Sequence, residues 1–156
     1  MEERLAAEEW HCVCLTGPGG LDRRVFRRGP SGRFFCLCHW PFCSSMHLLL
    51  SAADLAVCRA GAGTVAELTA CATPAVLVPY PFAAHDHQTC NALAMERMGA
   101  ALHWPQDRLG ELWGRIGDLC RSGGRETLRE NLLALRPALA GAAERLAAAV
   151  HGDLGP

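Results

Sequence analysis

The stretch "ADLAVCRAGAGTVAELTACATPAVLVPYPF", from Ala53 to Phe82, decides the fold. It opens with an apolar run that predicts a strand, continues with a helical pattern from Gly63, and closes in a second apolar run that ends at Pro79. Strands that alternate with helices at this short spacing are typical of a parallel sheet, and runs that are apolar throughout predict strands buried on both faces. The sequence therefore indicates the α/β class.

The segments on either side continue the alternation. We expect helices over residues 1–9, 45–52, a stretch that ends at Gly99 and the region 106–150, and strands in the runs that begin at His11, end at Trp40 and cover 100–104. In the last region, Leu109, Leu112, Ile116 and Leu119 have helical spacing, and Pro137 is expected to begin the final helix. We predict one domain over 1–156, a Rossmann-like parallel sheet with helices on both faces.

Composition and charge exclude several classes of protein. Of 156 residues, half are hydrophobic, and 15 basic residues nearly balance 16 acidic ones, which argues against a broad nucleic-acid surface. The one basic cluster, "RRVFRR" from Arg23 to Arg28, is expected to be a solvated helix face or turn. No apolar run reaches about 18 residues, and the acidic start does not resemble a signal peptide. We therefore expect a protein of the reducing cytoplasm.

Nine cysteines in such a compartment are expected to be thiols. Cys12 and Cys14, and likewise Cys36 and Cys38, lie two residues apart in runs that predict strands, so each pair shares one face of its strand. We interpret both pairs as small core residues. A four-thiolate zinc protein stays open as an alternative, although structural zinc favours wider spacings on turns.

The turn "RAGAGTVAE", which begins at Arg59, predicts a place for an anion. A helix that starts near Gly63 or Thr64 has free backbone N–H groups and the positive end of its dipole there, and glycines permit close approach. Thr64 adds a hydroxyl. The alternative is a capping box made by Thr64 and Glu67, which explains both residues without a ligand.

The loop after Pro79 is dense in side chains that form hydrogen bonds, namely His85, Asp86, His87, Gln88 and Asn91. Such a loop, at the edge of a parallel sheet where ligands bind, suits a sugar with many hydroxyls. The alternatives are a helix entry with Asp86 at its N-cap, or a metal held by the two histidines, for which the spacing is weak evidence.

Phe42 follows Pro41 at the end of a predicted strand. At that edge its ring is placed to stack on an aromatic ligand. A core role stays open as well, because a lone phenylalanine is more often buried.

Taken together, the runs "WPFCSSMHLLLSAADLAVCRAGAGTVAEL" and "TPAVLVPYPFAAHDHQTCNALAMERMGAA" resemble the C-terminal half of the MurG-type glycosyltransferases, most strongly over 41–101. The resemblance implies the C-terminal, donor-binding domain of a GT-B fold. It also implies a hexosyltransferase that moves N-acetylglucosamine from UDP-GlcNAc to the lipid-linked muramyl-pentapeptide of peptidoglycan synthesis, with inversion and without a cofactor.

The resemblance also implies site residues. By that likeness, Phe42 and Cys43 face the uracil, Arg59 lies by the nucleotide, Ala62, Gly63 and Thr64 hold the diphosphate, Glu67 accepts from the ribose diol, and His87, Gln88 and Asn91 lie by the sugar. No metal ligand and no certain catalytic residue are implied in this half.

The sequence departs from the family where an N-terminal domain and the first strand of the C-terminal sheet are expected. We therefore expect a UDP-GlcNAc-binding half that is inactive alone and meets the lipid acceptor through an N-terminal domain or subunit, at the inner face of the plasma membrane. The alternative is a non-catalytic nucleotide-binding or interaction module.

Overall fold

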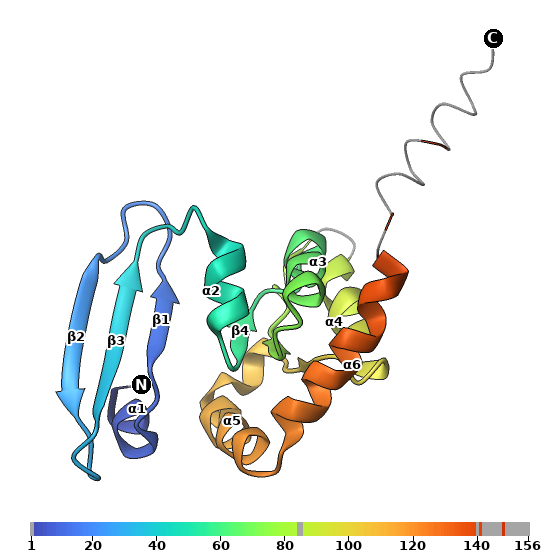
Figure 1. Ribbon diagram of the computed structural model, residues 1–156. Helices are drawn as coiled ribbons and strands as arrows, with labels where there is room; N and C mark the ends of the chain where they lie inside the picture. Colours follow the sequence, from blue (N-terminus) through green and yellow to red (C-terminus); the bar gives the residue numbers. More distant parts are fainter. Residues whose placement is uncertain (1, 84–85, 140, 142–147, 149–156) are drawn as a thin grey trace. The chain divides into compact units, whose positions relative to one another are not determined.

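The computed structural model describes residues 2–83, 86–139, 141 and 148, and the chain forms two compact units, residues 1–46 and 47–156 (Figure 1). Each unit contains its own three-stranded sheet. Both sheets include parallel strands, and helices alternate with strands along the second unit, so the expected α/β class is confirmed.

The first unit packs one helix on one sheet. Its elements are α1 (Glu2–Glu8), β1 (Cys12–Leu15), β2 (Arg23–Arg28) and β3 (Phe34–Trp40). The central strand is β3, which pairs in parallel with β1 and antiparallel with β2. Leu5 of α1 is buried together with Val25, Phe35 and Leu37 of the sheet, and these four side chains form the core of this unit.

The basic cluster is an edge strand, so the prediction of a helix face or turn is wrong. Every residue of β2 pairs with β3, and a turn closed by a bond from Gly29 N–H to the Arg33 carbonyl connects the two strands. Within β2 only Val25 is buried. The guanidinium of Arg24 lies 5.9 Å from the centre of the Trp40 ring, and Arg28 lies 5.1 Å from Phe34. Cross-strand cation–π pairing of this kind allows the arginine-rich segment to form a strand.

The strand cysteines are half-buried rather than core residues. All nine cysteines are free thiols, as expected, and the Sγ atoms of Cys36 and Cys38 are 3.2 Å apart on the face opposite Phe35 and Leu37. The large apolar side chains, not the thiols, fill this core. Burial raises the pKa of Cys12 to about 12, so this thiol stays protonated near neutral pH.

The second unit contains the βαβ pattern quoted from Ala53 to Phe82. Its strands are β4 (Ala56–Cys58), β5 (Ala75–Leu77) and β6 (Leu102–His103), and they form a fully parallel sheet in that order. The central strand β5 is buried at every residue, as an apolar run predicts. The edge strand β4 is not, because its far side has no neighbour in this sheet and Val57 is 48 % exposed.

The helices of this unit follow the expected order. They are α2 (Met46–Ala52), α3 (Ala62–Cys71), α4 (His87–Arg97), the 3-10 helix η2 (Gln106–Glu111), α5 (Leu112–Arg121) and α6 (Gly124–Leu139). Gly99 has a φ of +63° and ends α4 as predicted. Leu112, Ile116 and Leu119 are buried, but Leu109 lies in the 3-10 helix and is exposed. Pro137 lies inside α6, so the expectation that it begins a helix is wrong.

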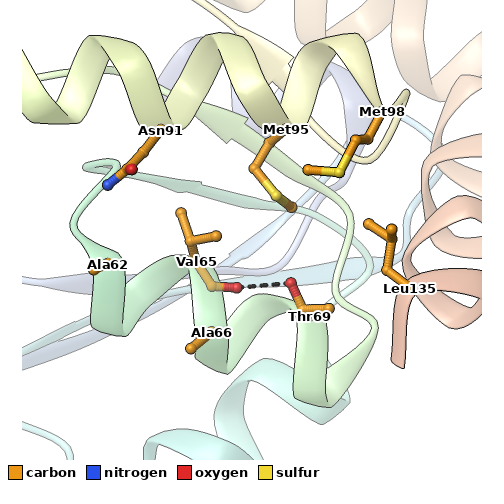
Figure 2. Close-up of a pocket in the computed structure, with 8 residues that line it drawn as sticks. All are labelled: Ala62, Val65, Ala66, Thr69, Asn91, Met95, Met98 and Leu135. Carbon is orange, nitrogen blue, oxygen red and sulfur yellow. Dashed lines mark hydrogen bonds between the residues drawn. The ribbon is translucent and has the colours of Figure 1, made fainter. Parts of the chain in front are cut away.

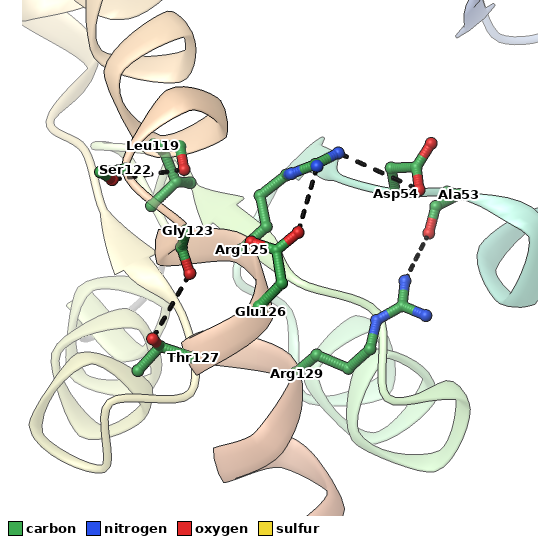
Figure 3. Close-up of polar contacts among 9 residues, drawn as sticks. All are labelled: Ala53, Asp54, Leu119, Ser122, Gly123, Arg125, Glu126, Thr127 and Arg129. Carbon is green, nitrogen blue, oxygen red and sulfur yellow. Dashed lines mark hydrogen bonds and ion pairs between the residues drawn. The ribbon is translucent and has the colours of Figure 1, made fainter.

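Polar contacts tie α6 to loops of the same unit (Figure 3). Arg129 donates through Nη2 to the Ala53 carbonyl over 3.2 Å, and Arg125 lies 4.0 Å from the Asp54 carboxylate. Leu132, on the same helix, is fully buried. These contacts place α6 against the segment that enters β4. Among the described residues, no helix is both long and apolar enough to cross a membrane.

Candidate functional site

Three loops of the second unit follow the carboxyl ends of its parallel strands, at residues 59–61, 78–83 and 104–106. Ligands of open parallel sheets bind at this edge. The first two loops contain or precede eight of the ten residues predicted to bind the donor. Contacts between side chains and backbone then show which of those residues lie together.

At the start of α3, backbone N–H groups have no partner among the residues that the structure describes. Gly61 is the N-cap residue, and the Val65 N–H is the first to pair within the helix, with the Gly61 carbonyl at 3.0 Å. The amides of Ala62, Gly63 and Thr64 precede that first bond, and no side chain in the described part of the chain caps them. A Cβ built at Gly63 would have no atom within 4 Å. An uncapped helix start of this kind has the geometry that an anion site requires, and the anion site itself stays a prediction.

The capping box expected from Thr64 and Glu67 does not form. The helix begins at Ala62, three residues earlier than a box headed by Thr64 requires, so Thr64 lies inside the first turn. Glu67 is exposed, and its carboxylate makes no hydrogen bond to any residue that the structure describes. Both side chains are therefore available to a ligand rather than used in capping.

Arg59 links all three loops. Its Nη1 donates to the carbonyls of Val78, at 3.2 Å, and Pro79, at 3.0 Å, and to Oε1 of Gln106, at 2.6 Å. The guanidinium also lies 5.4 Å from the centre of the Tyr80 ring, within the range of a cation–π contact. Arg59 thus holds the strand ends together, which the sequence did not predict.

Two predicted sugar-site amides are each fixed by one backbone bond. The Tyr80 N–H donates to Oε1 of Gln88 over 3.0 Å, and Nδ2 of Asn91 donates to the Ala60 carbonyl over 3.0 Å. In a carboxamide only the oxygen can accept from a backbone N–H and only the NH2 group can donate to a carbonyl, so these bonds set the orientation of both side chains. These bonds join the start of α4 to the loops after β4 and β5.

A groove of about 400 Å³ runs beside this region, between α3, α4 and α6 (Figure 2). Its lining residues are Ala62, Val65, Ala66, Thr69, Asn91, Met95, Met98 and Leu135. The Thr69 hydroxyl donates to the Val65 carbonyl, so little of the lining is polar beyond Asn91. Ala62 and Asn91 are the two members that also belong to the predicted donor site. A charged diphosphate fits the amides of α3 better than this groove.

The other polar residues predicted around the start of α4 are His85, Asp86 and His87. His87 is exposed at the first position of α4, Asp86 is the N-cap residue as expected but makes no side-chain cap, and His85 lies outside the described residues. Among the described residues no three His, Cys, Asp or Glu side chains gather around a metal position.

Cys58, which ends β4, has a pKa raised to about 11 by burial.

Phe42 and Cys43 belong to the first unit, where they follow β3. The Phe42 ring is 75 % exposed, so the alternative of a buried core role is wrong. An exposed ring at a strand end remains compatible with stacking on a flat ligand.

Sequence reasoning missed Tyr80 and Gln106. Tyr80 lies in the loop after Pro79, where its ring and the carbonyl before it contact Arg59 and its N–H donates to Gln88. Gln106 is separated from Arg59 by 47 positions, and no local pattern marks it. Its place directly after the third parallel strand, at the same edge as the other two loops, was the available signal.

Comparison with known proteins gives the family. Residues 2–123 match the model of the glycosyltransferase family 28 C-terminal domain. A relative from Opitutus terrae, named UDP-N-acetylglucosamine–N-acetylmuramyl-(pentapeptide) pyrophosphoryl-undecaprenol N-acetylglucosamine transferase, is 50 % identical over 74 % of this chain and 31 % of its own length. A relative of the same name from Gloeobacter violaceus is 47 % identical over 64 % of this chain and 27 % of its own length.

A solved structure supports the same assignment. The crystal structure of Acinetobacter baumannii MurG is similar with a TM-score of 0.58 and 34 % identity, over 70 % of this chain and 30 % of that one. The chain thus spans about a third of the length of the curated relatives that it matches. The resemblance to the C-terminal half of this family, expected from the sequence, is confirmed.

Proposed function

This chain belongs to glycosyltransferase family 28 as a C-terminal domain, and from that premise we propose that it binds UDP-GlcNAc as the donor half of a peptidoglycan N-acetylglucosaminyltransferase. In this proposal residues 1–156 act as one nucleotide-sugar-binding domain. The observation that carries the proposal is the start of α3, where three backbone amides have no hydrogen-bond partner among the described residues and a Cβ at Gly63 would meet nothing within 4 Å. The names and sequence identities of the relatives support the choice of ligand.

The diphosphate binds at the start of α3. The N–H groups of Ala62, Gly63 and Thr64 donate to its oxygens, and the helix dipole adds favourable potential. Arg59 lies at the end of the preceding strand. All three of its bonds come from Nη1, and among the described residues Nε and Nη2 make none, so these N–H groups remain to face the phosphates.

The nucleoside and the sugar use the flanking residues. Glu67 lies one turn beyond Thr64 on α3 and accepts from the ribose hydroxyls, since its carboxylate has no partner among the described residues. Phe42 and the Cys43 backbone contact the uracil, by likeness to the family. The sugar lies by three residues at the start of α4, namely His87, Gln88 and Asn91.

The reaction is a displacement at the anomeric carbon. An acceptor hydroxyl oxygen forms the new bond to that carbon, the bond from the carbon to the diphosphate oxygen breaks, and UDP leaves with the electron pair. Negative charge grows on the departing diphosphate, so donors at the start of α3 stabilise the transition state more than the bound substrate. The base that takes the hydroxyl proton, and the site for the lipid-linked acceptor, belong to an N-terminal half. The isolated chain therefore binds the donor without transferring the sugar.

The location proposed for the complete enzyme is the inner face of the plasma membrane, where the lipid acceptor is presented. The chain reaches that surface through its N-terminal partner, because the acceptor is lipid-linked. No bound cofactor has a part in the proposal.

A second candidate function is a non-catalytic interaction module. One observation favours it: the edge of β4 that faces away from β5 is unpaired within its sheet. Ala56 N–H donates to Pro74, and the Cys58 carbonyl accepts from Val78, so the backbone groups of Val57 point to the free edge. Such an edge accepts a strand from another chain.

Calorimetric titration of the chain with UDP, UDP-GlcNAc and GMP tests the proposal. We expect saturable binding of both uridine ligands and a weaker response to GMP, with no sugar transfer until an N-terminal half is added. Folded protein that produces no heat with millimolar UDP or UDP-GlcNAc would reject the donor function and leave the interaction module as the better account.

A further inference from the structure

We propose that Gln106 is a positioning residue that acts through Arg59. Its role is to fix which end of the Gln88 carboxamide, the NH2 donor or the oxygen acceptor, faces the sugar. The inference rests on the proposed function, and it deepens it by assigning a specificity role outside the residues expected to touch the ligand. It follows from contacts that connect three loops of the second unit.

The first step concerns the side chain of Gln88. Its Oε1 accepts the Tyr80 N–H over 3.0 Å, and that partner is a backbone donor that cannot pair with the amide nitrogen. The carboxamide therefore directs its Nε2 group away from Tyr80. A ligand at this position meets two N–H donors, so the site recognises a hydroxyl or carbonyl oxygen that accepts.

The second step concerns Asn91, whose carboxamide is oriented the opposite way, with its oxygen rather than its NH2 group left for a ligand. Its Nδ2 donates to the Ala60 carbonyl over 3.0 Å, so Oδ1 is the atom left for a ligand. One helix thus offers a donor from Gln88 and an acceptor from Asn91, three positions apart on the same side of α4. A pair of this kind suits two hydroxyls of one pyranose, one that accepts a hydrogen bond and one that donates.

The third step concerns what holds the Tyr80 N–H in place. The two residues before Tyr80 are fixed through their carbonyls by Nη1 of Arg59, and the Tyr80 ring lies against the same guanidinium. If this segment moves, the N–H leaves Gln88, and the carboxamide is free to turn over. The orientation of Gln88 thus depends on Arg59.

The fourth step concerns what holds Arg59. Oε1 of Gln106 accepts from Nη1 over 2.6 Å, the shortest of the three Arg59 bonds. Hydrogen bonds donated by a guanidinium are stronger than those between neutral groups. Of the three acceptors, Gln106 is the one side chain, so it is the one that a substitution can remove. Without it, the guanidinium has two backbone carbonyls left and turns more readily toward a bound phosphate.

The test compares Gln106→Leu, which removes the acceptor, with Gln106→Glu, which restores one for Arg59. In the free protein, hydrogen exchange of the Tyr80 amide is measured by NMR. We expect this amide to be protected in the natural chain, to exchange roughly tenfold faster in Gln106→Leu, and to regain protection in Gln106→Glu. Asp107→Asn, at the exposed neighbouring position, is the control that leaves the exchange unchanged.

Binding supplies the second readout. We expect Gln106→Leu to keep the Kd for UDP within about twofold while the preference for UDP-GlcNAc over UDP falls several-fold. Gln88→Glu keeps an oxygen for the Tyr80 N–H but presents an oxygen to the sugar, so the preference should be lost there too. A natural chain that does not bind UDP would reject the proposed function. Unchanged Tyr80 exchange in Gln106→Leu would overturn the positioning role, whatever the binding results.

Discussion

Asn91 donates through Nδ2 to the carbonyl of Ala60, 3.0 Å away, and so joins α4 to the turn that leads into α3. Asn131 makes a bond of the same kind, from Nδ2 to the Gly99 carbonyl over 2.8 Å, but on α6. The two asparagines differ in place rather than in chemistry, and this makes them a matched pair.

The substitution Asn91→Ala should weaken UDP-GlcNAc binding roughly tenfold, because it removes one hydrogen bond to the ligand and loosens the turn at the diphosphate. Asn131→Ala should lower the free energy of unfolding by a similar amount, about 1 kcal/mol, without changing the Kd. Urea unfolding and calorimetry measure the two effects. Equal losses of affinity in both variants would show that Asn91 has no special relation to the ligand.

Gly63 should show opposite effects on stability and binding. Its backbone is helical and a Cβ there would meet nothing within 4 Å, so Gly63→Ala should stabilise the folded chain by about 0.5–1 kcal/mol. The same methyl group should lower the affinity for UDP several-fold, since it stands where the diphosphate approaches the amides.

The control is Gly114→Ala in α5, where a Cβ also meets nothing within 4 Å. It should give the stability gain with an unchanged Kd. If Gly63→Ala bound UDP as tightly as Gly114→Ala does, the diphosphate would not lie against the start of α3.

Glu67 should distinguish ribose from deoxyribose. The Glu67→Gln variant should lose most of the preference for UDP over its 2′-deoxy analogue, because a carboxylate accepts from both hydroxyls of a diol and an amide accepts with one oxygen. Stability should change little, since Glu67 has no hydrogen-bond partner among the described residues. Competition binding with the two nucleotides measures the preference. Glu130→Gln, at an exposed position of α6, is the control, and an equal change there would contradict the assignment.

Cysteine reactivity should follow burial. Burial raises the pKa of Cys58 to about 11, so its thiol is the protonated form at pH 8 and its alkylation rate should rise about tenfold per pH unit until that pKa is approached. Cys90 is exposed on α4 and should react first with iodoacetamide at pH 8. Peptide mass spectrometry measures both sites, with urea-unfolded chain as the reference. Equal rates for Cys58 and Cys90 in the folded chain would be inconsistent with the packing of β4.

The sequence predicted what depends on local pattern. The βαβ segment from Ala53 to Phe82 has uninterrupted apolar runs and a helix between them, and its elements formed as expected. The segment from Arg23 to Arg28 did not, because its strand depends on pairing with β3 and on cross-strand contacts with aromatic rings. A pattern of charge alone does not contain that information.

The candidate site divides in the same way. The start of α3 is predictable from the glycines at 61 and 63 and from the helical pattern that follows them, although the helix begins one or two residues before the expected Gly63 or Thr64. The alternative of a capping box at Thr64 and Glu67 does not form. The contacts of Arg59 with Pro79 and Gln106 were not predictable, because they join loops that are distant in sequence and meet through the parallel order of three strands.

The central claim is that the amides at the start of α3 hold a diphosphate. Titration of the ¹⁵N-labelled chain with UDP, followed by amide chemical shifts, tests it most directly. We predict that UDP causes its largest chemical-shift changes at the amides of Ala62, Gly63 and Thr64. Uridine, which has no phosphate, should leave the chemical shifts of these three amides unchanged. Saturable UDP binding that moves other amides and leaves these three unchanged would contradict the account.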